Sequence, residues 1–489
     1  MLARKMDASD LTRQEALLAP MYGSRELGEP VPRYELPDGR MPAQVAYQLV
    51  HDELNLDGNP ALNLASFVTT WMEPEADRLM AESFGRNYID ADEYPQTTEI
   101  HNRCVNMLAG LFHAPSGEGA AVGCATVGSS EAIHLAGLAM KWRWRARRAA
   151  QGLPTGAPNI VMGANVQVCW EKFARYFDVE ARYVPLTGER FVIGVEEAMS
   201  MVDENTIGVV GILGSTYTGE YEPVKELNDA IVALNSERGW DVALHVDGAS
   251  GAFVAPFTAP DLEWDFRLPA VRSINASGHK YGLVYPGVGW VVWRSEDDLP
   301  SDLIFHVNYL GGDQPTFNLN FSRGAGQILA QYYNFLRLGR QGYTEVMRTL
   351  EQTASHLASA VACIGPFEIL SKPRTVPLVC FRLEDAAARP YSVFDISSEL
   401  RQRGWIVPAY TMAPDAEEVA VLRVVVKENF SRDLADMLAS DLARSVEHLE
   451  AHGPSRHGTS HAGPGSSHIR AAAPAKAHAA NHRRAHGVC

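Results

Sequence analysis

The stretch INASGHKYG, residues 274–282, is the part of the sequence on which the predicted fold depends most. A small, polar turn that contains glycine leads here to Lys280. A lysine in such a position can form a Schiff base with an aldehyde, provided that its pocket lowers the pKa of the amine. The same letters are also typical of a surface loop, so this motif needs support from the rest of the chain.

A second motif, LHVDGASG at residues 244–251, is typical of a buried strand with Asp247 at its C-terminal end. Ligands of open α/β sheets bind outside the C-terminal ends of the strands. A carboxylate there can keep a pyridine nitrogen protonated, so that the ring withdraws electrons. It can equally cap a turn. The 33 residues from Asp247 to Lys280 fit one further strand with its connections.

Two more motifs precede these along the chain. In TVGSSEAIHL, from residue 126, small residues followed by Ser129 and Ser130 open a strong helical pattern. Backbone N–H groups and hydroxyls at such a helix start suit a phosphate, although ordinary helix capping explains the same letters. In VQVCWEKFARYF at 166–177, the planar side chain of Gln167 could lie on one face of a flat cofactor, although the segment also resembles core.

The four motifs support one another through their order. A phosphate cradle, a ring-face residue, an aspartate at a strand end and a lysine follow one another on a single alternating α/β stretch. This is the layout of the large domain of fold-type I enzymes, which use pyridoxal 5'-phosphate (PLP). The sequence therefore predicts a PLP enzyme of the α/β class.

Periodicity predicts the domain organisation. From 61 to 345, strand-like apolar runs alternate with helical stretches, which favours a mainly parallel sheet covered by helices. The clearest strand candidates are residues 159–163, 206–214, 242–248 and 289–294, and the clearest helices are 131–150 and 224–239. Residues 326–364 are strongly helical. A smaller α+β domain is predicted over 346–450, with strands at 376–383 and 420–426 and helices at 394–403 and 432–450.

The two ends of the chain differ from this body. Residues 1–60 are predicted to form an irregular N-terminal arm with a short helix at 43–54. Residues 451–489 are rich in Ala, Gly, Pro, Ser and His, and they hold five basic residues and no acidic one. Because such a segment can bury little apolar surface, we expect a disordered, basic, His-rich tail.

Composition excludes several classes of protein. The 489 residues carry a net charge of −16, which disfavours a general nucleic-acid binder. The N-terminal residues lack the apolar core of a secretory signal, and no apolar run is long enough to span a membrane, so we expect a cytoplasmic protein. The six cysteines show no CxxC pair or zinc-like spacing, so neither a disulfide framework nor a metal site is expected.

Longer stretches resemble the glutamate decarboxylases, which belong to group II of the PLP-dependent decarboxylases. The resemblance covers about 40–450 and rests on LNLASFVTTW at 62–71, GRNYIDADEYPQT at 85–97, HNRCVNMLAGLFHAP at 101–115, VGSSEAIHLAGLAMKWRWR, DENTIGVVGILGSTYTGEYE, WDFRLPAVRSINASGHKYGL and NYLGGDQPTFNLNFSR. It implies a fold-type I large domain with a mainly parallel seven-stranded sheet flanked by helices, a small C-terminal α+β domain, and decarboxylation of L-glutamate to 4-aminobutyrate and CO2.

The resemblance also implies roles for individual residues. Lys280 would be the Schiff-base lysine, Asp247 the partner of the pyridine nitrogen, and both would be catalytic together with His279. Gln167 would stack on the ring, and Thr216 would lie near the 3-hydroxyl group. The phosphate contacts would be Ser129, Ser130, Ser277 and His279, with Ser322 reaching the phosphate of a neighbouring subunit. For the substrate, Ser66, Phe67, Asn87 and Asp90 would form the pocket for the side-chain carboxylate, and Arg423 would bind the α-carboxylate.

Two positions depart from the family pattern. Ser66 stands where threonine is common, but a hydroxyl is kept. Glu171 stands where some members carry histidine, so no proton-transfer role can be assigned to that position.

The resemblance further implies a homodimer at minimum, with a hexamer as the larger alternative. Calmodulin binding, which occurs in some relatives, is not expected, because residues 431–489 contain no Trp, Phe or Tyr anchor. Three alternatives stay open at this point. They are a group II decarboxylase of an aromatic amino acid or cysteine sulfinate, a PLP lyase or desulfurase, and an inactive scaffold.

The tail leaves a separate question open. It holds seven histidines, at 452, 457, 461, 468, 478, 482 and 486. In some bacterial relatives a C-terminal histidine closes the active site near neutral pH, and His461 is the nearest here by position. A solvated linker and a metal-binding tract are the alternatives.

Overall fold

The computed structural model describes residues 31–115, 121–309 and 311–454. By its internal contacts the chain divides into two compact units, Met1–Asn63 and Leu64–Cys489. In the first unit, helix α2 spans Ala43–Leu54 and a 3-10 turn spans Pro60–Leu62. The helix predicted at 43–54 is therefore confirmed. Residues 1–30 of the predicted arm lie outside the described residues.

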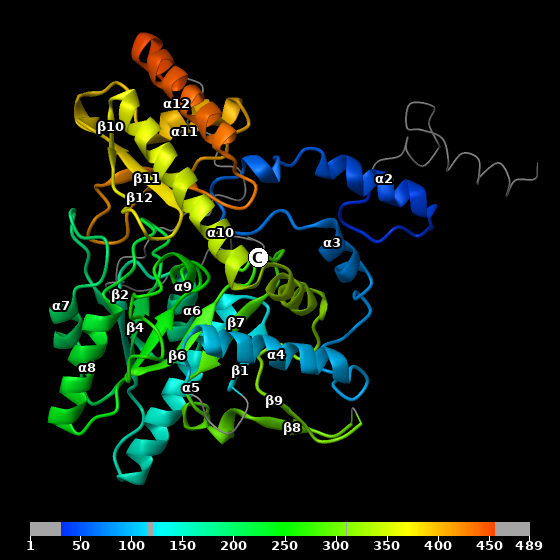
Figure 1. Ribbon diagram of the computed structural model, residues 1–489, viewed down its shortest axis with the longest axis vertical. Helices are drawn as coiled ribbons and strands as arrows, with labels where there is room; N and C mark the ends of the chain where they lie inside the picture. Colours follow the sequence, from blue (N-terminus) through cyan, green and yellow to red (C-terminus); the bar gives the residue numbers. More distant parts are fainter. Residues whose placement is uncertain (1–30, 116–120, 310, 455–489) are drawn as a thin grey trace, which may run out of the picture. The chain divides into compact units, whose positions relative to one another are not determined.

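A seven-stranded sheet forms the centre of the second unit (Figure 1). Its spatial order is β1-β7-β6-β5-β4-β2-β3, and only β7 runs antiparallel to its neighbours. The strands are β1 (Gly123–Thr126), β2 (Asn159–Gly163), β3 (Glu180–Val184), β4 (Thr206–Ile212), β5 (Ala243–Asp247), β6 (Val271–Ala276) and β7 (Gly289–Trp293). This confirms the predicted mainly parallel, seven-stranded sheet.

The central strands are buried along their whole length, and most of their residues are apolar, because helices cover both faces of the sheet. Every residue of β2, β4, β5 and β7 is buried. One cluster of the core lies between the sheet and two helices, and it includes Ile133, Trp144, Ile160, Trp170 and Phe173. The helices around this sheet are α3 (Pro74–Ala81), α4 (Pro95–Leu111), α5 (Ser129–Ala150), α6 (Val168–Tyr176), α7 (Val195–Ser200), α8 (Val224–Arg238) and α9 (Ala255–Thr258).

A four-stranded antiparallel sheet with two helices follows the large sheet in the chain. Its order is β10-β11-β13-β12, with β10 (Phe367–Ile369), β11 (Leu378–Leu383), β12 (Ala409–Thr411) and β13 (Ala420–Val425). Helices α11 (Val393–Gln402) and α12 (Arg432–His452) complete it. Short strands β8 (Phe305–Val307) and β9 (Gln314–Thr316) form a separate hairpin. The predicted α+β composition of this part is confirmed.

Helix α10 (Gly326–Ile364) connects the two sheets and passes through the predicted domain boundary at 345/346. It is interrupted at Gly339, where φ is 55° and ψ is −169°, a conformation that a side chain at this position would disfavour. The helical pattern predicted over 326–364 is thus confirmed for both parts of this helix, which Figure 1 shows running from the large sheet to the smaller one.

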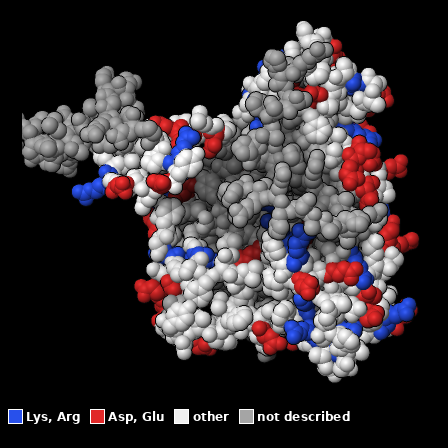
Figure 2. All heavy atoms as spheres, turned by 180° about the vertical axis from the view of Figure 1, so that it is seen from behind, with Lys and Arg blue, Asp and Glu red and all other residues white. Residues whose placement is uncertain are grey.

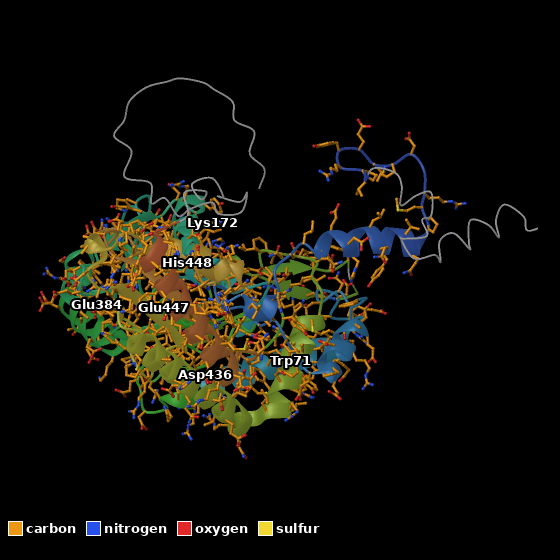
Figure 3. The ribbon with its side chains drawn as sticks, turned by 90° about the horizontal axis from the view of Figure 1, so that it is seen from above. Trp71, Lys172, Glu384, Asp436, Glu447 and His448 are labelled. Carbon is orange, nitrogen blue, oxygen red and sulfur yellow. The ribbon has the colours of Figure 1, made fainter. Side chains whose placement is uncertain are left out.

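Helix α12 ends the described part of the chain. It buries Ala435, Leu438, Leu442 and Leu449, while its other face exposes Asp436, Glu447 and His448, which Figure 3 labels. The helix continues to His452, so the tail predicted from 451 begins slightly later than expected. The predicted disorder of the tail falls on residues 455–489, which lie outside the described residues.

Acidic side chains are spread over the face of the molecule shown in Figure 2, with basic side chains between them, in keeping with the net charge. No helix among residues 31–115, 121–309 and 311–454 is long and apolar enough to cross a bilayer. Five cysteines lie in the described ranges and all are unpaired.

Candidate active site

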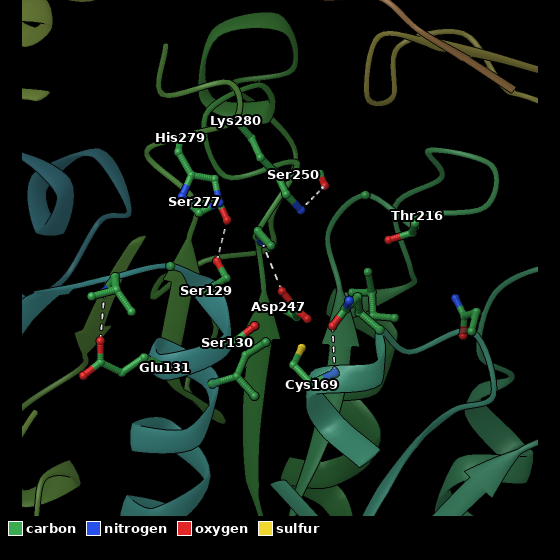
Figure 4. Close-up of a pocket in the computed structure, with 18 residues that line it drawn as sticks. Ser129, Ser130, Glu131, Cys169, Thr216, Asp247, Ser250, Ser277, His279 and Lys280 are labelled. Carbon is green, nitrogen blue, oxygen red and sulfur yellow. Dashed lines mark hydrogen bonds between the residues drawn. The ribbon is translucent and has the colours of Figure 1, made fainter. Parts of the chain in front are cut away.

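A cavity of about 410 Å³ opens where strands β2, β4, β5 and β6 end (Figure 4). These strands are parallel, so their C-terminal ends lie along one edge of the sheet, where ligands of such folds bind. Eight of the predicted site residues line the cavity, and they are Ser129, Ser130, Gln167, Thr216, Asp247, Ser277, His279 and Lys280. Chain folding therefore brings together residues that span 152 positions in the sequence.

Lys280 lies in the cavity wall with its amine toward the interior. Its Nζ donates a hydrogen bond to Ser250 Oγ at 3.2 Å and lies 5.3 Å from the centre of the Phe67 ring. Burial lowers the pKa of Lys280, although the nearby Asp247 carboxylate opposes part of this effect. A lowered pKa is the property that a Schiff-base lysine needs, because only the neutral amine is nucleophilic.

The start of helix α5 forms one end of the cavity. Ser129 Oγ and Ser277 Oγ are 2.7 Å apart, and the first backbone N–H groups of the 22-residue helix have no partner within the helix. A Cβ atom on Gly289 would lie 2.4 Å from the carbonyl carbon of Gly128, so only glycine lets strand β7 pass this close to the helix start. Such a cradle of hydroxyls and N–H groups fits a phosphate.

His279 completes this end of the cavity as a neutral donor. Burial lowers the pKa of His279 to about 4, and the neighbouring Lys280 charge acts in the same direction. Its Nδ1 accepts from the backbone N–H groups of Gly287 and Val288 at 3.4 and 3.3 Å. The single proton of the neutral ring is therefore on Nε2, where it can donate to a phosphate oxygen.

Asp247 is the last residue of β5 and lines the cavity. Its Oδ1 accepts from Asn275 Nδ2 at 3.0 Å and from Ala249 N–H at 3.1 Å, while its Oδ2 accepts from Trp170 Nε1 at 2.9 Å. A carboxylate offers about four acceptor positions, so one position remains on Oδ2. One N–H group of a protonated pyridine ring would fill it, and the residues present therefore fit PLP.

Gln167 stands at the N-cap of helix α6. Its side-chain oxygen accepts from the backbone N–H of Cys169 at 2.7 Å, which fixes the side-chain amide at the cavity. The same residue therefore serves as a helix cap and lies where a ring-face residue was predicted.

Arg423 and Phe67 lie next to the cavity. The guanidinium carbon of Arg423 lies 4.8 Å from the centre of the Phe67 ring, whose other cationic neighbour is Lys280. Arg423 donates to the carbonyl oxygen of Thr216, which lines the cavity, and to that of Ala65. It is only 7% exposed, its Nε has no hydrogen-bond partner, and none of the ion pairs within the described ranges includes it. A buried cation without a carboxylate partner is costly, so an anionic ligand is expected beside it.

The segment 64–72, which carries Ser66 and Phe67, is held on two sides. On one side the residues in and after strand β13 bind it, since Lys427 Nζ donates to Val68 O at 3.2 Å and Glu428 Oε1 accepts from Thr70 N at 2.7 Å. On the other side Thr69 donates its backbone N–H to His279 O at 2.9 Å and its hydroxyl to Lys280 O at 2.7 Å. The segment thus connects the four-stranded sheet with the turn that carries the lysine. Ser66 Oγ accepts from Val68 N within the segment.

Three predicted residues lie elsewhere in the single chain. Asn87, Asp90 and Ser322 do not line the cavity. They belong to a second group, in which Asn87 Nδ2 is 3.5 Å from Ser322 Oγ and Asn87 Oδ1 accepts from the backbone N–H of Arg323. Their predicted roles, like those of the residues in the cavity, stay predictions.

The sequence motifs missed several residues of the cavity. Ser250, which holds the lysine amine, is part of the motif that delivers Asp247 and could have been found from it. Cys169 and Asn165 flank Gln167 without a pattern of their own. Beside the cavity, Tyr410, whose ring centre is 5.5 Å from the Arg423 guanidinium, has no sequence signal either. Glu171 does not line the cavity and is exposed on α6.

Within the described ranges, no three His, Cys, Asp or Glu residues are placed to hold a metal ion.

Comparison with known proteins agrees with this geometry. Residues 37–384 match the family model described as "Pyridoxal-dependent decarboxylase conserved domain". This chain belongs to the pyridoxal-dependent decarboxylases. PLP is therefore the cofactor, and the predicted fold-type I class is confirmed.

Individual members of this family are closely similar. The protein named glutamate decarboxylase 5 of Arabidopsis thaliana is 60% identical over 88% of this chain and 87% of its own length. A glutamate decarboxylase of Aliivibrio fischeri is 49% identical over 91% of this chain and 96% of its own. The solved glutamate decarboxylase of Lactobacillus brevis has a TM-score of 0.85 at 44% identity and covers 88% of this chain, while 98% of its own chain is matched.

Proposed function

We propose that this decarboxylase removes the α-carboxylate of L-glutamate and releases 4-aminobutyrate and CO2. The observation that carries the proposal is Arg423, a buried guanidinium without a carboxylate partner in the described structure, next to Phe67 and Lys280. The similarity over most of the chain to proteins named glutamate decarboxylase supports the choice of substrate.

PLP supplies the aldehyde that joins the substrate amine and the ring that accepts the electron pair left behind by CO2. The chain determines which bond breaks. Arg423 would bind the α-carboxylate, and the segment 64–72 would orient the rest of the substrate from the side of Phe67. Holding the α-carboxylate and the rest of the substrate at two separate places would fix which bond of the α-carbon is presented for cleavage.

Lys280 would also serve in proton transfer. In its protonated form its side-chain amine, which donates to Ser250 Oγ at 3.2 Å, would hold the proton that is delivered to the substrate α-carbon. A hydroxyl of the cavity is the alternative donor. Since the product keeps its amine and one carboxylate, each turnover consumes one proton.

The second group of residues requires a partner in this proposal. Asn87, Asp90 and Ser322 lie outside the cavity of their own chain, so we propose that they complete the cavity of a second copy. The active unit would be a homodimer at least, with a hexamer as the larger alternative, acting in the cytoplasm.

A substrate panel tests the proposed reaction. CO2 release and product identity are measured with L-glutamate, L-aspartate, an aromatic amino acid and cysteine sulfinate, each over a range of pH. Glutamate should give the highest kcat/KM, with 4-aminobutyrate as product. A higher kcat/KM for another substrate would contradict the proposal.

A further inference from the structure

A chain of buried polar side chains lies behind Asp247, on its far side from the cavity. Strands β5 and β6 are neighbours, and their register pairs His245 with Ser273 and Asp247 with Asn275. Residues two apart in a strand point to the same side, so these four side chains form one row. His245 and Asn275 are completely buried, and Ser273 is 1% exposed.

The hydrogen bonds in this row can run in only one direction. The Asp247 carboxylate can only accept, so the amide of Asn275 donates through Nδ2, at 3.0 Å. The remaining atom of that amide, Oδ1, must therefore accept from His245 Nε2, which is 2.8 Å away. Burial lowers the pKa of His245, so the ring has a single proton, and it is on Nε2. His245 Nδ1 then accepts from the Ser273 hydroxyl at 2.7 Å.

Every donor in the row thus points toward Asp247. Each hydrogen bond polarises the next one, which strengthens the last bond of the row, the one to the carboxylate. Trp170 contributes from the other side, because its Nε1 donates to Oδ2 and its ring packs against His245 with the ring centres 5.2 Å apart. With the Ala249 N–H group, these contacts fill three acceptor positions of the carboxylate and leave one free.

We propose that His245 and Asn275 are positioning residues that orient Asp247 toward the ring nitrogen of the cofactor. The inference rests on the proposed pairing of Asp247 with PLP, but not on the identity of the substrate. A purely structural role would require only that the row fill its space between the strands. The proposed role also requires that the donor at the position of His245 Nε2 be present.

Two substitutions of His245 separate these roles. The amide nitrogen of glutamine reaches the position of Nε2, whereas that of asparagine reaches only the position of Nδ1. His245→Gln therefore keeps a donor for Asn275, and His245→Asn removes it while the side chain stays polar. Asn275→Leu breaks the same link without a change at His245, and it serves as the second variant if His245→Asn does not fold.

The readouts are the Kd for PLP of the full-length apoenzyme and the 15N chemical shift of the labelled ring nitrogen in the holoenzyme. For His245→Gln we expect a Kd within about twofold of wild type and a protonated ring nitrogen. For His245→Asn and Asn275→Leu we expect a Kd raised by about tenfold and a shift toward the unprotonated form. Equal values for the Gln and Asn variants, or an unchanged 15N shift in Asn275→Leu, would overturn the inference. Neither readout needs glutamate, so a wrong substrate assignment would leave this test valid.

Discussion

The guanidinium carbon of Arg423 lies 4.8 Å from the centre of the Phe67 ring, although 356 positions separate the two residues in the sequence. The four-stranded sheet supplies the arginine and the segment 64–72 supplies the ring, and both lie beside Lys280 of the large sheet. Substrate selection therefore depends on how these three parts of the second unit are held together.

Replacement of Lys280 tests the centre of the site. Lys280→Ala should lower CO2 release from glutamate to the background rate, because the chain then lacks the amine that joins the cofactor and returns the proton. The fold and part of the PLP affinity should remain, since the phosphate cradle and Asp247 are unchanged. Far-UV circular dichroism and equilibrium dialysis with PLP measure these two properties. The matched control is Lys225→Ala, which removes a lysine from an exposed ion pair on α8. Substantial activity in Lys280→Ala would show that the assignment of Lys280 is wrong.

Arg423→Ala tests the α-carboxylate site. Loss of a buried charged partner costs about 2 kcal/mol or more, so kcat/KM for glutamate should fall by roughly 30-fold or more while the Kd for PLP changes little. Phe67→Ala should act in the same direction. Arg382→Ala, on strand β11 and paired with Glu368, removes an arginine from the same sheet as a control. Near-normal kcat/KM in both Arg423→Ala and Phe67→Ala would place the substrate pocket elsewhere.

Mixing two inactive variants tests whether the second group of residues acts in a partner subunit. Lys280→Ala lacks the lysine, and the double variant Asn87→Ala/Asp90→Ala lacks two of the residues proposed to act in trans. After subunit exchange at equal concentrations, half of the dimers should be mixed, and each should contain one intact site. Activity should then recover to roughly a quarter of that of wild type. If the residues act within their own chain, the mixture stays inactive, and an active monomer in light scattering would also contradict the proposal.

Three histidines, of which His101 and His245 are buried and His279 is half-buried, predict how stability depends on pH. Burial lowers the pKa of His101, His245 and His279 to about 4, whereas an unfolded histidine titrates near ~6.5. Between these values the unfolded chain binds more protons than the folded one, so the free energy of unfolding falls as the pH drops from about 6.5 to 4. Each additional proton bound by the unfolded chain lowers the free energy of unfolding by about 1.4 kcal/mol for each pH unit of the drop.

Glu222 changes the free energy of unfolding in the opposite direction. Burial raises its pKa to about 7, so over much of the same pH range its carboxyl is protonated in the folded chain and ionised in the unfolded one. Urea unfolding at several pH values and a fixed PLP concentration measures the net slope of the free energy of unfolding against pH. Because three histidines act in one direction and Glu222 in the other, this slope should correspond to about two protons. His101→Gln keeps an acceptor for the Ala125 N–H group that His101 Nε2 now binds at 2.9 Å. It should reduce the slope by about one proton, and an unchanged slope would contradict the explanation.

The His-rich tail can be tested without disturbing the described helix. Since α12 continues to His452, truncation should follow residue 454. If the tail closes the site near neutral pH, the truncated enzyme should keep its activity at acid pH and extend it toward neutral pH. An unchanged pH–rate profile would leave the solvated-linker interpretation.

The sequence alone determined the elements and the order of the main site motifs, because both are local properties. A strand such as β2, with its apolar run at residues 160–162, and a helix such as α8, with a 3.6-residue period, are visible within a few residues of sequence. Lys280, Asp247 and Ser129 could be proposed for the same reason, since each lies in a short motif whose neighbours are typical of its chemistry.

Only the tertiary structure decided which distant side chains meet. Nothing near Trp170 indicates that it binds Asp247, 77 positions away, or that Asn275 and His245 form a row of donors behind that carboxylate. The same holds for Arg423, which reaches Ala65 across 358 positions. Such contacts follow from strand order, register and the packing of one sheet against another, which depend on the whole chain at once and leave no periodic signal at either residue.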